Sequence, residues 1–442
     1  MDFKGKINRQ NPVVRRARGG GPTRALCANV RFVFSFFIAF PVLPRYNNHM
    51  DKNDLRRVSP VPWTLVVLLG VLLAGLVLLR LLASPAAAPE VIPSPVPTAE
   101  PTPGAAETML ADMTLREKLC QLLVVEPQAL AEEKTVTAVD EQLTAALEQY
   151  PVCGLMLTGE NIKTADQLKS FTREVNRLAP GMLICVDEEG GRVARLMNTV
   201  GTTKLNNMYS YRNDGTQTAY KNGWILGQDL CAFGFNTDFA PVADVWTSSK
   251  TDVIGNRAYS DDYDQAAELV ASAVRGFRDG GVLCCLKHFP GHGSTETDSH
   301  EEAAVVDKDL NTLRREDLKP FVSGIAAGAD MVMVGHLSVP ALDDVPASMS
   351  HRIITGLLRE ELGFGGVIVT DGLQMKAAGA WTDGEKAVKC LSAGADLLLE
   401  IEDVPGTIAA LEQAVKDGKL TEQRIDESVL RILQMKLDRG IL

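Results

Sequence analysis

The sequence predicts an α/β protein whose main domain is a (β/α)8 TIM barrel, preceded by an N-terminal transmembrane helix and a proline-rich linker. From about residue 108, short apolar runs alternate with amphipathic stretches, as in a barrel of strands and helices. Charged residues or histidines follow several of these runs. A long apolar segment near the N-terminus predicts the membrane helix. A doubly wound open sheet is the alternative to the barrel, because a strand count from sequence is accurate to about one or two strands.

The acid–base balance divides the chain into two parts. Residues 1–62 hold 12 basic and 3 acidic residues, whereas the remainder holds 33 basic and 53 acidic residues. Hydrophobic residues make up 45% of the chain and charged residues 23%, which is ordinary for a globular protein with a large core. The acidic main body argues against nucleic acid as a partner.

The basic segment is expected to be cytoplasmic and to precede a signal anchor at 63–82. Trp63 to Leu82 is long enough to span the hydrocarbon core as a helix. Arg56 and Arg57 lie just before it, so the positive-inside rule keeps residues 1–62 in the cytoplasm and sends the catalytic domain outward. A cleaved signal peptide is the competing interpretation, because small residues follow at 86–88. We also expect translation to begin at Met50, which opens a short charged head before the span.

A linker at 83–107 joins this anchor to the body at 108–442. Ser84 to Ala106 contains seven prolines and no basic residue, a composition that favours extended conformations over a packed core. The body holds seven cysteines at irregular spacings, without a CxxC pair. We interpret most of them as buried free thiols rather than as a zinc or redox motif. The protein is thus expected to be a single-pass cell-membrane protein with an extracellular, monomeric catalytic domain.

Eight apolar runs are candidate strands of the barrel, and four amphipathic stretches between them are the clearest helices. The predicted strands are Leu122–Val125, Val152–Leu157, Met182–Val186, Phe235–Phe239, Val282–Leu286, Met331–Val334, Val367–Thr370 and Asp396–Leu399. The predicted helices are Thr164–Leu178, Asp264–Arg278, Asp317–Ala327 and His351–Leu362.

Five of these runs end in residues that can carry chemistry. They are Asp187 after the third run, Lys287 and His288 after the fifth, His336 after the sixth, Asp371 after the seventh and Glu400 after the eighth. In a TIM barrel, the active site lies at the carboxyl ends of the strands. Although polar residues at strand ends are also ordinary turn formers and helix caps, five in register favour an active site.

The segment from Lys287 to His300 holds three of the six histidines, within a loop that contains Gly291 and Gly293. The two glycines suit a mobile loop. Asp298 lies two residues before His300, and a carboxylate near an imidazole can fix its tautomer and raise its basicity. Such a pair can act as general acid and then as general base. The alternative is a solvated loop histidine beside an acidic run.

Three further groups complete the candidate site. Asp371 follows a strand expected to be buried on both faces, where a carboxylate can act as a nucleophile or an electrostatic stabiliser, or merely as a helix cap. Asp187 can accept sugar hydroxyls, and Arg195 and Arg257 can donate to others. Lys287 offers a donor, or it neutralises a carboxylate such as Asp371.

These motifs resemble those of the glycoside hydrolase family 3 β-N-acetylhexosaminidases. The resemblance is carried by Lys287–Gly293 continuing through Asp298-Ser299-His300, by Asp187-x-Glu189-Gly190-Gly191-Arg192-Val193, by Arg257 and by Thr370–Met375, and it covers about residues 108–440. Two positions vary from the family pattern: Gly372 stands where members frequently have Asp or Ala, and Glu188 occupies a tolerant position.

The resemblance implies a retaining exo-β-N-acetylglucosaminidase that releases terminal N-acetylglucosamine from cell-wall or related glycans. It implies that Asp371 is the nucleophile, that His300 with Asp298 is the acid/base, and that the sugar is held by Asp187, Arg195, Arg257, Lys287 and His288. It implies no cofactor and no metal. Family 3 β-glucosidases instead take a glutamate from a second domain, for which we expect no room because the chain ends at Leu442.

Several alternatives stay open. Within the family, the chain could be a β-glucosidase or an N-acetylglucosaminide phosphorylase. Outside it, the histidines and aspartates could bind a metal, although the H-x-H and H-E-x-x-H spacings of metal hydrolases are absent. An inactive wall-binding module is a third class.

Overall fold

The computed structural model describes residues 104–131, 135–248, 253–296 and 304–442. The predicted anchor at 63–82 and residues 83–103 of the linker predicted at 83–107 lie outside these residues, as does the pair Asp298 and His300. Among the helices that the model does describe, none is long and apolar enough to cross a membrane.

The central feature is a closed barrel of eight parallel strands in the order β1-β12-β11-β9-β7-β6-β3-β2. The strands are β1 (Leu123–Val125), β2 (Gly154–Met156), β3 (Leu183–Val186), β6 (Thr237–Asp238), β7 (Leu283–Phe289), β9 (Met331–Val334), β11 (Val367–Gly372) and β12 (Leu397–Leu399). Each falls on one of the eight predicted runs, so the TIM barrel is confirmed and the open sheet is excluded. The barrel closes where β1 pairs with β12, with Leu123 opposite Leu398.

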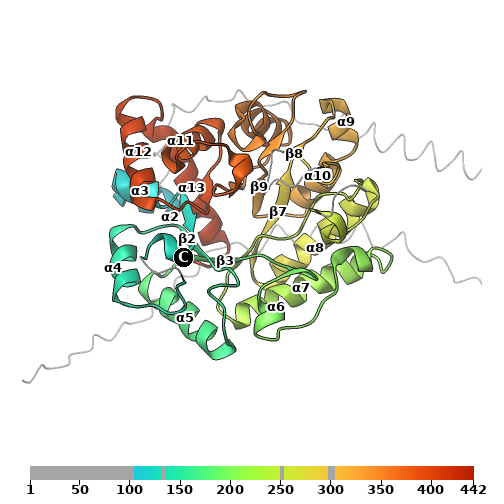
Figure 1. Cartoon of the computed structure of the whole chain (residues 1–442), viewed down its shortest axis with the longest axis horizontal. Helices are drawn as coiled ribbons and strands as arrows, with labels where there is room; N and C mark the ends of the chain where they lie inside the picture. The colour runs from blue at the N-terminus through green and yellow to red at the C-terminus, as the bar shows by residue number, and fades with distance from the viewer. Residues whose placement is uncertain (1–103, 132–134, 249–252, 297–303) are drawn as a thin grey trace, which may run out of the picture. The chain divides into compact units, whose positions relative to one another are not determined.

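Helices lie around the strands, as Figure 1 shows. They are α2 (Ala105–Asp112), α3 (Leu115–Cys120), α4 (Glu141–Gln149), α5 (Ala165–Leu178), α6 (Leu196–Thr199), α7 (Thr216–Ala232), α8 (Tyr263–Gly280), α9 (Leu310–Arg315), α10 (Leu318–Ala326), the π-helix η5 (Arg352–Glu361), α11 (Asp383–Ala393), α12 (Val404–Lys416) and α13 (Glu422–Asp438). The four predicted helices correspond to α5, α8, α10 and η5. Short 3-10 turns are η1 (Pro127–Ala129), η2 (Met208–Tyr211), η3 (Gly255–Arg257), η4 (Ala347–Met349) and η6 (Lys376–Ala378).

Side chains at the helix starts explain where several helices begin. The Thr164 hydroxyl accepts from the backbone N–H of Gln167 at the start of α5. Asp262 caps α8 in the same way, and Thr382 forms a reciprocal capping box with Glu385 at α11. Such caps satisfy backbone donors that have no partner within the helix. The local sequence thereby sets the entry point of these helices.

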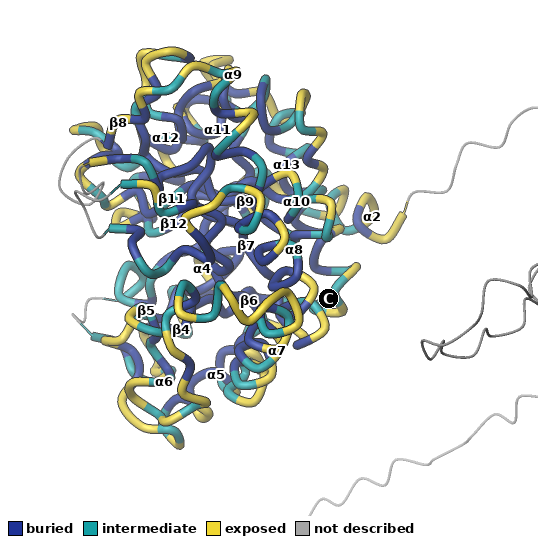
Figure 2. The backbone as a smooth tube through the Cα atoms, turned by 90° about the vertical axis from the view of Figure 1, so that its right-hand side faces the viewer, coloured by how far each residue is buried: buried dark blue, intermediate teal, exposed yellow. Residues whose placement is uncertain are grey.

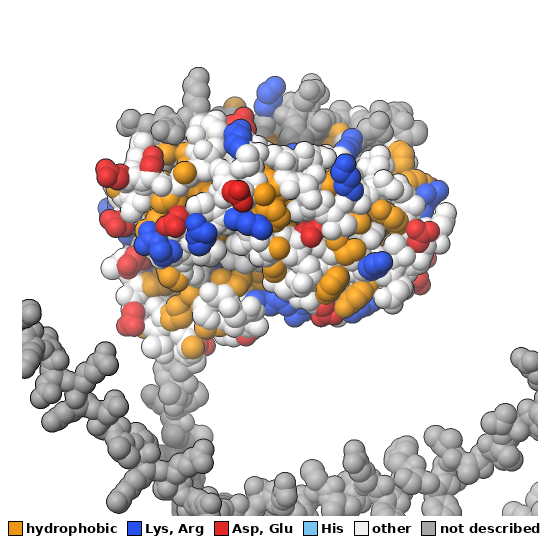
Figure 3. Space-filling view, turned by 90° about the horizontal axis from the view of Figure 1, so that it is seen from below, with side chains coloured by type: hydrophobic (Ala, Val, Ile, Leu, Met, Phe, Trp, Pro, Cys, Tyr) orange, Lys and Arg blue, Asp and Glu red, His pale blue; other side chains and the backbone are white. Residues whose placement is uncertain are grey.

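The core is continuous between the strands and the ring of helices. Figure 2 shows the buried segments concentrated along the central strands and the exposed ones at the periphery. On the face in Figure 3, hydrophobic, acidic and basic side chains are interspersed. Of the seven body cysteines, Cys231 is exposed and the other six are buried, and all seven are free thiols, in agreement with the interpretation above. These thiols pack as small hydrophobes.

Two small sheets lie outside the barrel. β4 (Glu188–Gly190) and β5 (Val193–Ala194) form an antiparallel hairpin directly after β3, whereas β8 (Ala304–Val305) pairs in parallel with β10 (Leu337–Ser338). The hairpin matters for the site because it carries Glu189 and leads to Arg195.

Candidate active site

Charged groups gather at the carboxyl ends of the barrel strands. Asp187 directly follows β3, Lys287 and His288 lie within β7, Asp371 lies within β11, and Glu400 directly follows β12. A cavity of about 300 Å³ brings them together. Its other charged or imidazole-bearing lining residues are Glu126, Glu189, Arg195, Arg257 and His292. Of the predicted residues that the structure describes, Asp187, Arg195, Arg257, Lys287, His288, Asp371 and Glu400 thus lie at one cavity, and His336 does not.

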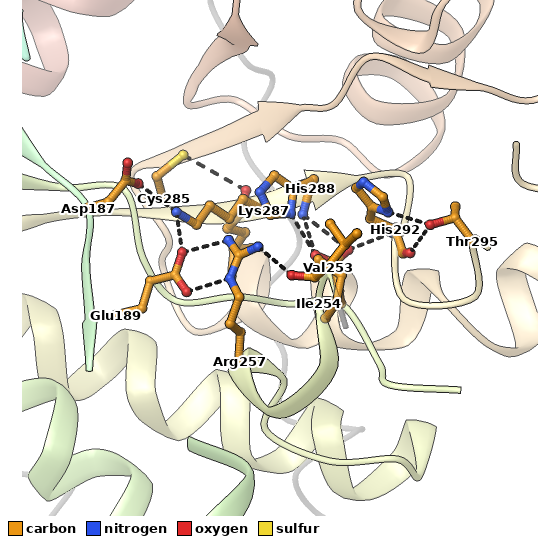
Figure 4. Close-up of polar contacts among 12 residues, drawn as sticks. Asp187, Glu189, Val253, Ile254, Arg257, Cys285, Lys287, His288, His292 and Thr295 are labelled. Carbon is orange, nitrogen blue, oxygen red and sulfur yellow. Dashed lines mark hydrogen bonds and ion pairs between the residues drawn. The ribbon is translucent and has the colours of Figure 1, made fainter. Parts of the chain in front are cut away.

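A compact ion-pair network forms one side of this cavity (Figure 4). The ammonium of Lys287 lies 2.6 Å from Asp187 Oδ1 and 2.7 Å from Glu189 Oε1. Arg257 donates to the same glutamate twice, from Nε at 2.8 Å and from Nη2 at 2.7 Å. Lys287 and Glu189 are almost completely buried. The two opposite charges stabilise each other, because a buried charge without a partner carries a large desolvation cost.

The pKa values within this network follow from the pairing. Burial by itself raises the pKa of Glu189, but Arg257 and Lys287 outweigh burial and hold that pKa well below its ordinary value. Burial likewise opposes the charge of Lys287, and Asp187 and Glu189 outweigh it, so that its pKa rises. The predicted neutralisation of a carboxylate by Lys287 is thus directed mainly at Asp187 and Glu189 rather than at Asp371.

Asp244 organises the histidines and was missed by sequence reasoning. Its Oδ2 lies 2.7 Å from His288 Nδ1, and its Oδ1 accepts from the backbone N–H of His292 at 2.6 Å. Because an ionised carboxylate only accepts hydrogen bonds, His288 Nδ1 carries a hydrogen and donates it to Asp244. The second ring nitrogen of His288, Nε2, takes no part in this contact. The signal was present in Pro241-Val242-Ala243, a short apolar run after β6 that ends in Asp244.

The first part of the histidine loop is packed rather than open. His292 is 2% exposed, and its Nδ1 lies 2.6 Å from the Thr295 hydroxyl. The carbonyl of Gly293 accepts from the backbone N–H of Thr247 and of Ser248. A Cβ on Gly293 would overlap the Val245 carbonyl, so this glycine permits close backbone packing. Residues 290–293 and Thr295 are therefore packed against the rest of the barrel, whereas Glu296 is exposed.

Asp371 lies opposite the ion-pair network and is kept ionised. Burial raises its pKa, but His288, the backbone N–H of Gly372 and Lys287 outweigh burial and lower it. The Gly372 N–H donates to Asp371 Oδ1 at 2.9 Å. An ionised carboxylate in a cavity can attack an electrophilic carbon.

His336 does not line the cavity. It is fully buried, with Nδ1 2.7 Å from the Ser348 hydroxyl and Nε2 2.9 Å from the Gly372 carbonyl. Burial lowers its pKa, so this histidine is neutral. These contacts join the end of β9 to β11. His336 therefore has a structural role and does not face the cavity. In the described ranges, no three His, Cys, Asp or Glu residues are placed to hold a metal ion.

Two neighbouring residues position the site from the hairpin. Glu188, placed above at a tolerant position, is buried and accepts from the backbone N–H groups of Arg195, Leu196 and Met197. This holds Arg195 at the cavity edge, where its Nε is buried without a hydrogen-bond partner among the described residues. Arg195 is thus a donor available to a ligand.

A larger cavity, of about 510 Å³, lies at the other end of the barrel. Its lining includes Pro151 and Val152, just before β2, and Gly181 and Met182, just before β3. It holds no comparable cluster of converging charges. The smaller cavity at the carboxyl ends is therefore the candidate active site.

Comparison with known proteins identifies the family of the chain. Residues 114–435 match the glycosyl hydrolase family 3 N-terminal domain. The chain is 32% identical over 333 residues to a β-hexosaminidase A of Pseudoalteromonas piscicida, covering 68% of this chain and 56% of that protein. It is 37% identical over 305 residues to a β-hexosaminidase of Idiomarina loihiensis, covering 67% of this chain and 89% of that protein.

Comparison with solved structures also points to family 3. The family 3 β-N-acetylglucosaminidase of a Paenibacillus species superposes with a TM-score of 0.70 at 36% identity, covering 74% of this chain and 63% of that one. The chain thus spans less than two thirds of that enzyme and of the Pseudoalteromonas protein. The matched segment contains the whole barrel and all the cavity residues named above, and the chain belongs to glycosyl hydrolase family 3.

Proposed function

We propose that the chain is a retaining exo-β-N-acetylglucosaminidase that removes terminal N-acetylglucosamine through a covalent glycosyl–enzyme intermediate. One observation carries this proposal. An ionised Asp371 lies in the same cavity as the ion-pair network of Asp187, Glu189, Arg257 and Lys287. The names of the matched relatives, β-hexosaminidase and β-N-acetylglucosaminidase, support the same activity.

The network leaves hydrogen-bonding capacity for sugar hydroxyls. Lys287 has three N–H donors, of which two point at Asp187 and Glu189. Arg257 uses Nε and Nη2 for Glu189 and Nη1 for the Val253 carbonyl, which leaves two of its five N–H groups. His288 Nε2, Arg195 Nε and the second oxygen of Asp187 add further partners. These groups would bind the non-reducing sugar.

Asp371 would attack the anomeric carbon as the leaving oxygen departs. Retention of configuration follows, because water then displaces the enzyme from the same face that the leaving group occupied. Lys287 and the backbone N–H of Gly372 favour the ionised form of Asp371, so it is ready to attack without a separate base.

Proton transfer is assigned to His300 with Asp298. Both lie outside the described residues, and the assignment rests on the sequence motif that continues from Lys287. His300 would protonate the leaving oxygen and then activate water, with Asp298 fixing its tautomer.

The anchor at 63–82 would place this domain outside the cell membrane, tethered by the linker at 83–107. Glycans of the cell wall that end in N-acetylglucosamine are then the accessible substrates. The support for this location is the basic segment 1–62 and the apolar span after it.

Hydrolysis of p-nitrophenyl β-N-acetylglucosaminide by the full chain tests the proposal. Asp371→Ala should abolish most activity, and His300→Ala should retain more, because this aryl leaving group needs little protonation. The matched β-glucoside should be a poor substrate, phosphate should not accelerate turnover, and a chelator should leave activity unchanged. Wild-type activity in both variants would refute the mechanism. A chain that is inactive on every glycoside would favour the wall-binding module instead.

A further inference from the structure

Glu400 is a cavity residue to which the proposed mechanism gives no role. It directly follows β12, and its backbone N–H donates to the Val124 carbonyl of β1 at 2.8 Å. Its side chain lines both the 300 Å³ cavity that holds Asp371 and an adjoining cavity of about 630 Å³. Glu400 therefore stands where the sugar cavity meets its neighbour.

The backbone of Glu400 is strained. Its φ is 56°, and among the described residues no other non-glycine residue has a positive φ. A left-handed conformation is unfavourable for an L-residue because its Cβ approaches the following carbonyl oxygen. Such conformations persist where the surroundings hold them, and they cluster at active sites and ligand-binding positions.

Two neighbours on β11 and after it hold the Glu400 carboxyl group. Gln374 donates from Nε2 to Glu400 Oε2 at 2.9 Å. A Cβ on Gly372 would overlap the same oxygen, so the glycine provides the space that the carboxyl group fills. Gly372 directly follows Asp371, which places Glu400 against the backbone of the proposed nucleophile.

We propose that Glu400 is a substrate-contacting residue that binds the sugar through its carboxyl group, and that Gly372 and Gln374 hold this group in place. The proposal rests on the function proposed above. It deepens that function by adding a contact on the β11–β12 side of the cavity, opposite Lys287 and Arg257.

The electrostatic surroundings define the form in which Glu400 binds. The pKa of Glu400 is raised to about 8. Burial is the main cause, the nearby carboxylates of Asp187, Glu126 and Asp371 contribute, and Arg195 acts in the opposite direction. At neutral pH, Glu400 is therefore a neutral acid that can donate a hydrogen bond to a sugar oxygen, whereas Asp371 is ionised. Two carboxyl groups in one cavity thus have different protonation states, as their different roles require.

The test compares three variants of the full chain with wild type, using p-nitrophenyl β-N-acetylglucosaminide between pH 5.5 and 9. Glu400→Ala should raise KM about fivefold to tenfold with little change in kcat, because it removes a contact made in ground state and transition state alike. Glu400→Gln keeps a neutral donor of the same shape and should stay within about threefold of wild type at pH 6.5. The control Glu422→Gln makes the same substitution at an exposed glutamate of α13 that lines neither cavity, and it should leave KM unchanged.

The pH profile separates a contact from mere packing. Wild-type kcat/KM should fall as pH rises through about 8, because Glu400 loses its donor hydrogen and places a negative charge beside Asp371. Glu400→Gln should remove this fall. Overlapping profiles, or an unchanged KM in Glu400→Ala, would overturn the proposal. So would a loss limited to substrates with poor leaving groups, since that identifies Glu400 as a proton donor.

Gly372→Ala tests the positioning. It should raise KM in the wild-type background and have a smaller effect in Glu400→Ala, because the coupled pair is already broken. Equal effects in both backgrounds would contradict the role given to Gly372.

Calorimetric binding of free N-acetylglucosamine distinguishes this proposal from the function on which it rests. If wild type binds the sugar but hydrolyses no glycoside, the function fails while weaker binding by Glu400→Ala still supports the contact. If wild type hydrolyses and Glu400→Ala binds equally well, only the contact fails.

Discussion

The two sides of the cavity treat buried charge in opposite ways. On the β3–β7 side, Asp187, Glu189, Arg257 and Lys287 satisfy one another through short ion pairs. On the β11–β12–β1 side, Asp371, Glu400 and Glu126 have no direct salt bridge in the described part of the chain. Their carboxyl groups rely on backbone, amide and longer-range contacts instead.

The difference explains how one cavity can both bind and react. Ion pairing holds the pKa of Glu189 below its ordinary value and the pKa of Lys287 above its ordinary value, so both groups stay charged at neutral pH and Lys287 stays a donor. The unpaired side keeps one carboxyl ionised and another protonated, and such groups can change their state during a reaction. Ion pairing holds the sugar-binding groups in position, whereas carboxyl groups without ion pairs can change their protonation state during the reaction.

Asp371→Asn should have the largest effect, because it removes the reactive group and leaves the paired side intact. We expect kcat/KM to fall by about four orders of magnitude, as for other essential nucleophiles. Sugar binding should persist within about tenfold, since Lys287 and Arg257 are unchanged. Turnover measures the first effect and calorimetric binding of N-acetylglucosamine the second. Loss of both would show that the two sides are not separable.

Glu189→Gln should weaken the folded state rather than the chemistry alone. It leaves Lys287 and Arg257 short of a buried partner, so the free energy of unfolding should fall by about 3 kcal/mol. The pKa of Glu189 is lowered by folding, so its contribution is present above about pH 4.5 and is lost as pH falls below that value. Denaturant titrations at pH 7 and pH 4 should therefore differ less for Glu189→Gln than for wild type.

Glu400→Gln should give the opposite sign in the same measurement. Folding raises the pKa of Glu400 from 4.5 to about 8, so the wild type loses stability as pH rises between these values. The variant lacks this loss, and its stability relative to wild type should increase from pH 5 to pH 8. Parallel pH dependences for Glu189→Gln and Glu400→Gln would remove the distinction between the two sides.

The sequence predicted the strand-end residues on both sides of the cavity better than the contacts between them. Strand ends are visible as apolar runs followed by polar residues, and β3, β7 and β11 delivered Asp187, Lys287 and Asp371 as expected. The sequence could not predict the hydrogen-bond partner of His288, because Asp244 lies 44 residues away along the chain. The two residues are brought together by the backbone bridge between Val242 and Lys287. Nor could the sequence reveal the state of Glu400, which depends on burial and on carboxylates from three other strands. The predicted pair Asp298 and His300 stays a prediction.

Asp244→Asn should have an intermediate effect. The change keeps the size of the side chain but removes the charge beside His288 Nδ1, and its amide can point a donor at that nitrogen. We expect kcat/KM to fall about 30-fold through misorientation of His288. The folded pKa of Asp244 is below its ordinary value, so this carboxylate is ionised at both pH 7 and pH 4, and the loss should be similar at the two pH values. A loss confined to one of the two pH values would contradict a role for the Asp244 charge.

Glu126→Gln should have the smallest effect and gives the finest test of the unpaired side. Glu126 is one of the carboxylates that raise the pKa of Glu400, and its own pKa is raised by burial and by its acidic neighbours. Removing its charge makes ionised Glu400 less costly, so the alkaline fall in kcat/KM should move to lower pH, by less than about one unit. The Glu400→Gln background should abolish this shift. If the shift persisted there, the alkaline fall would belong to another group, and the unpaired side would contain a titrating group other than Glu400.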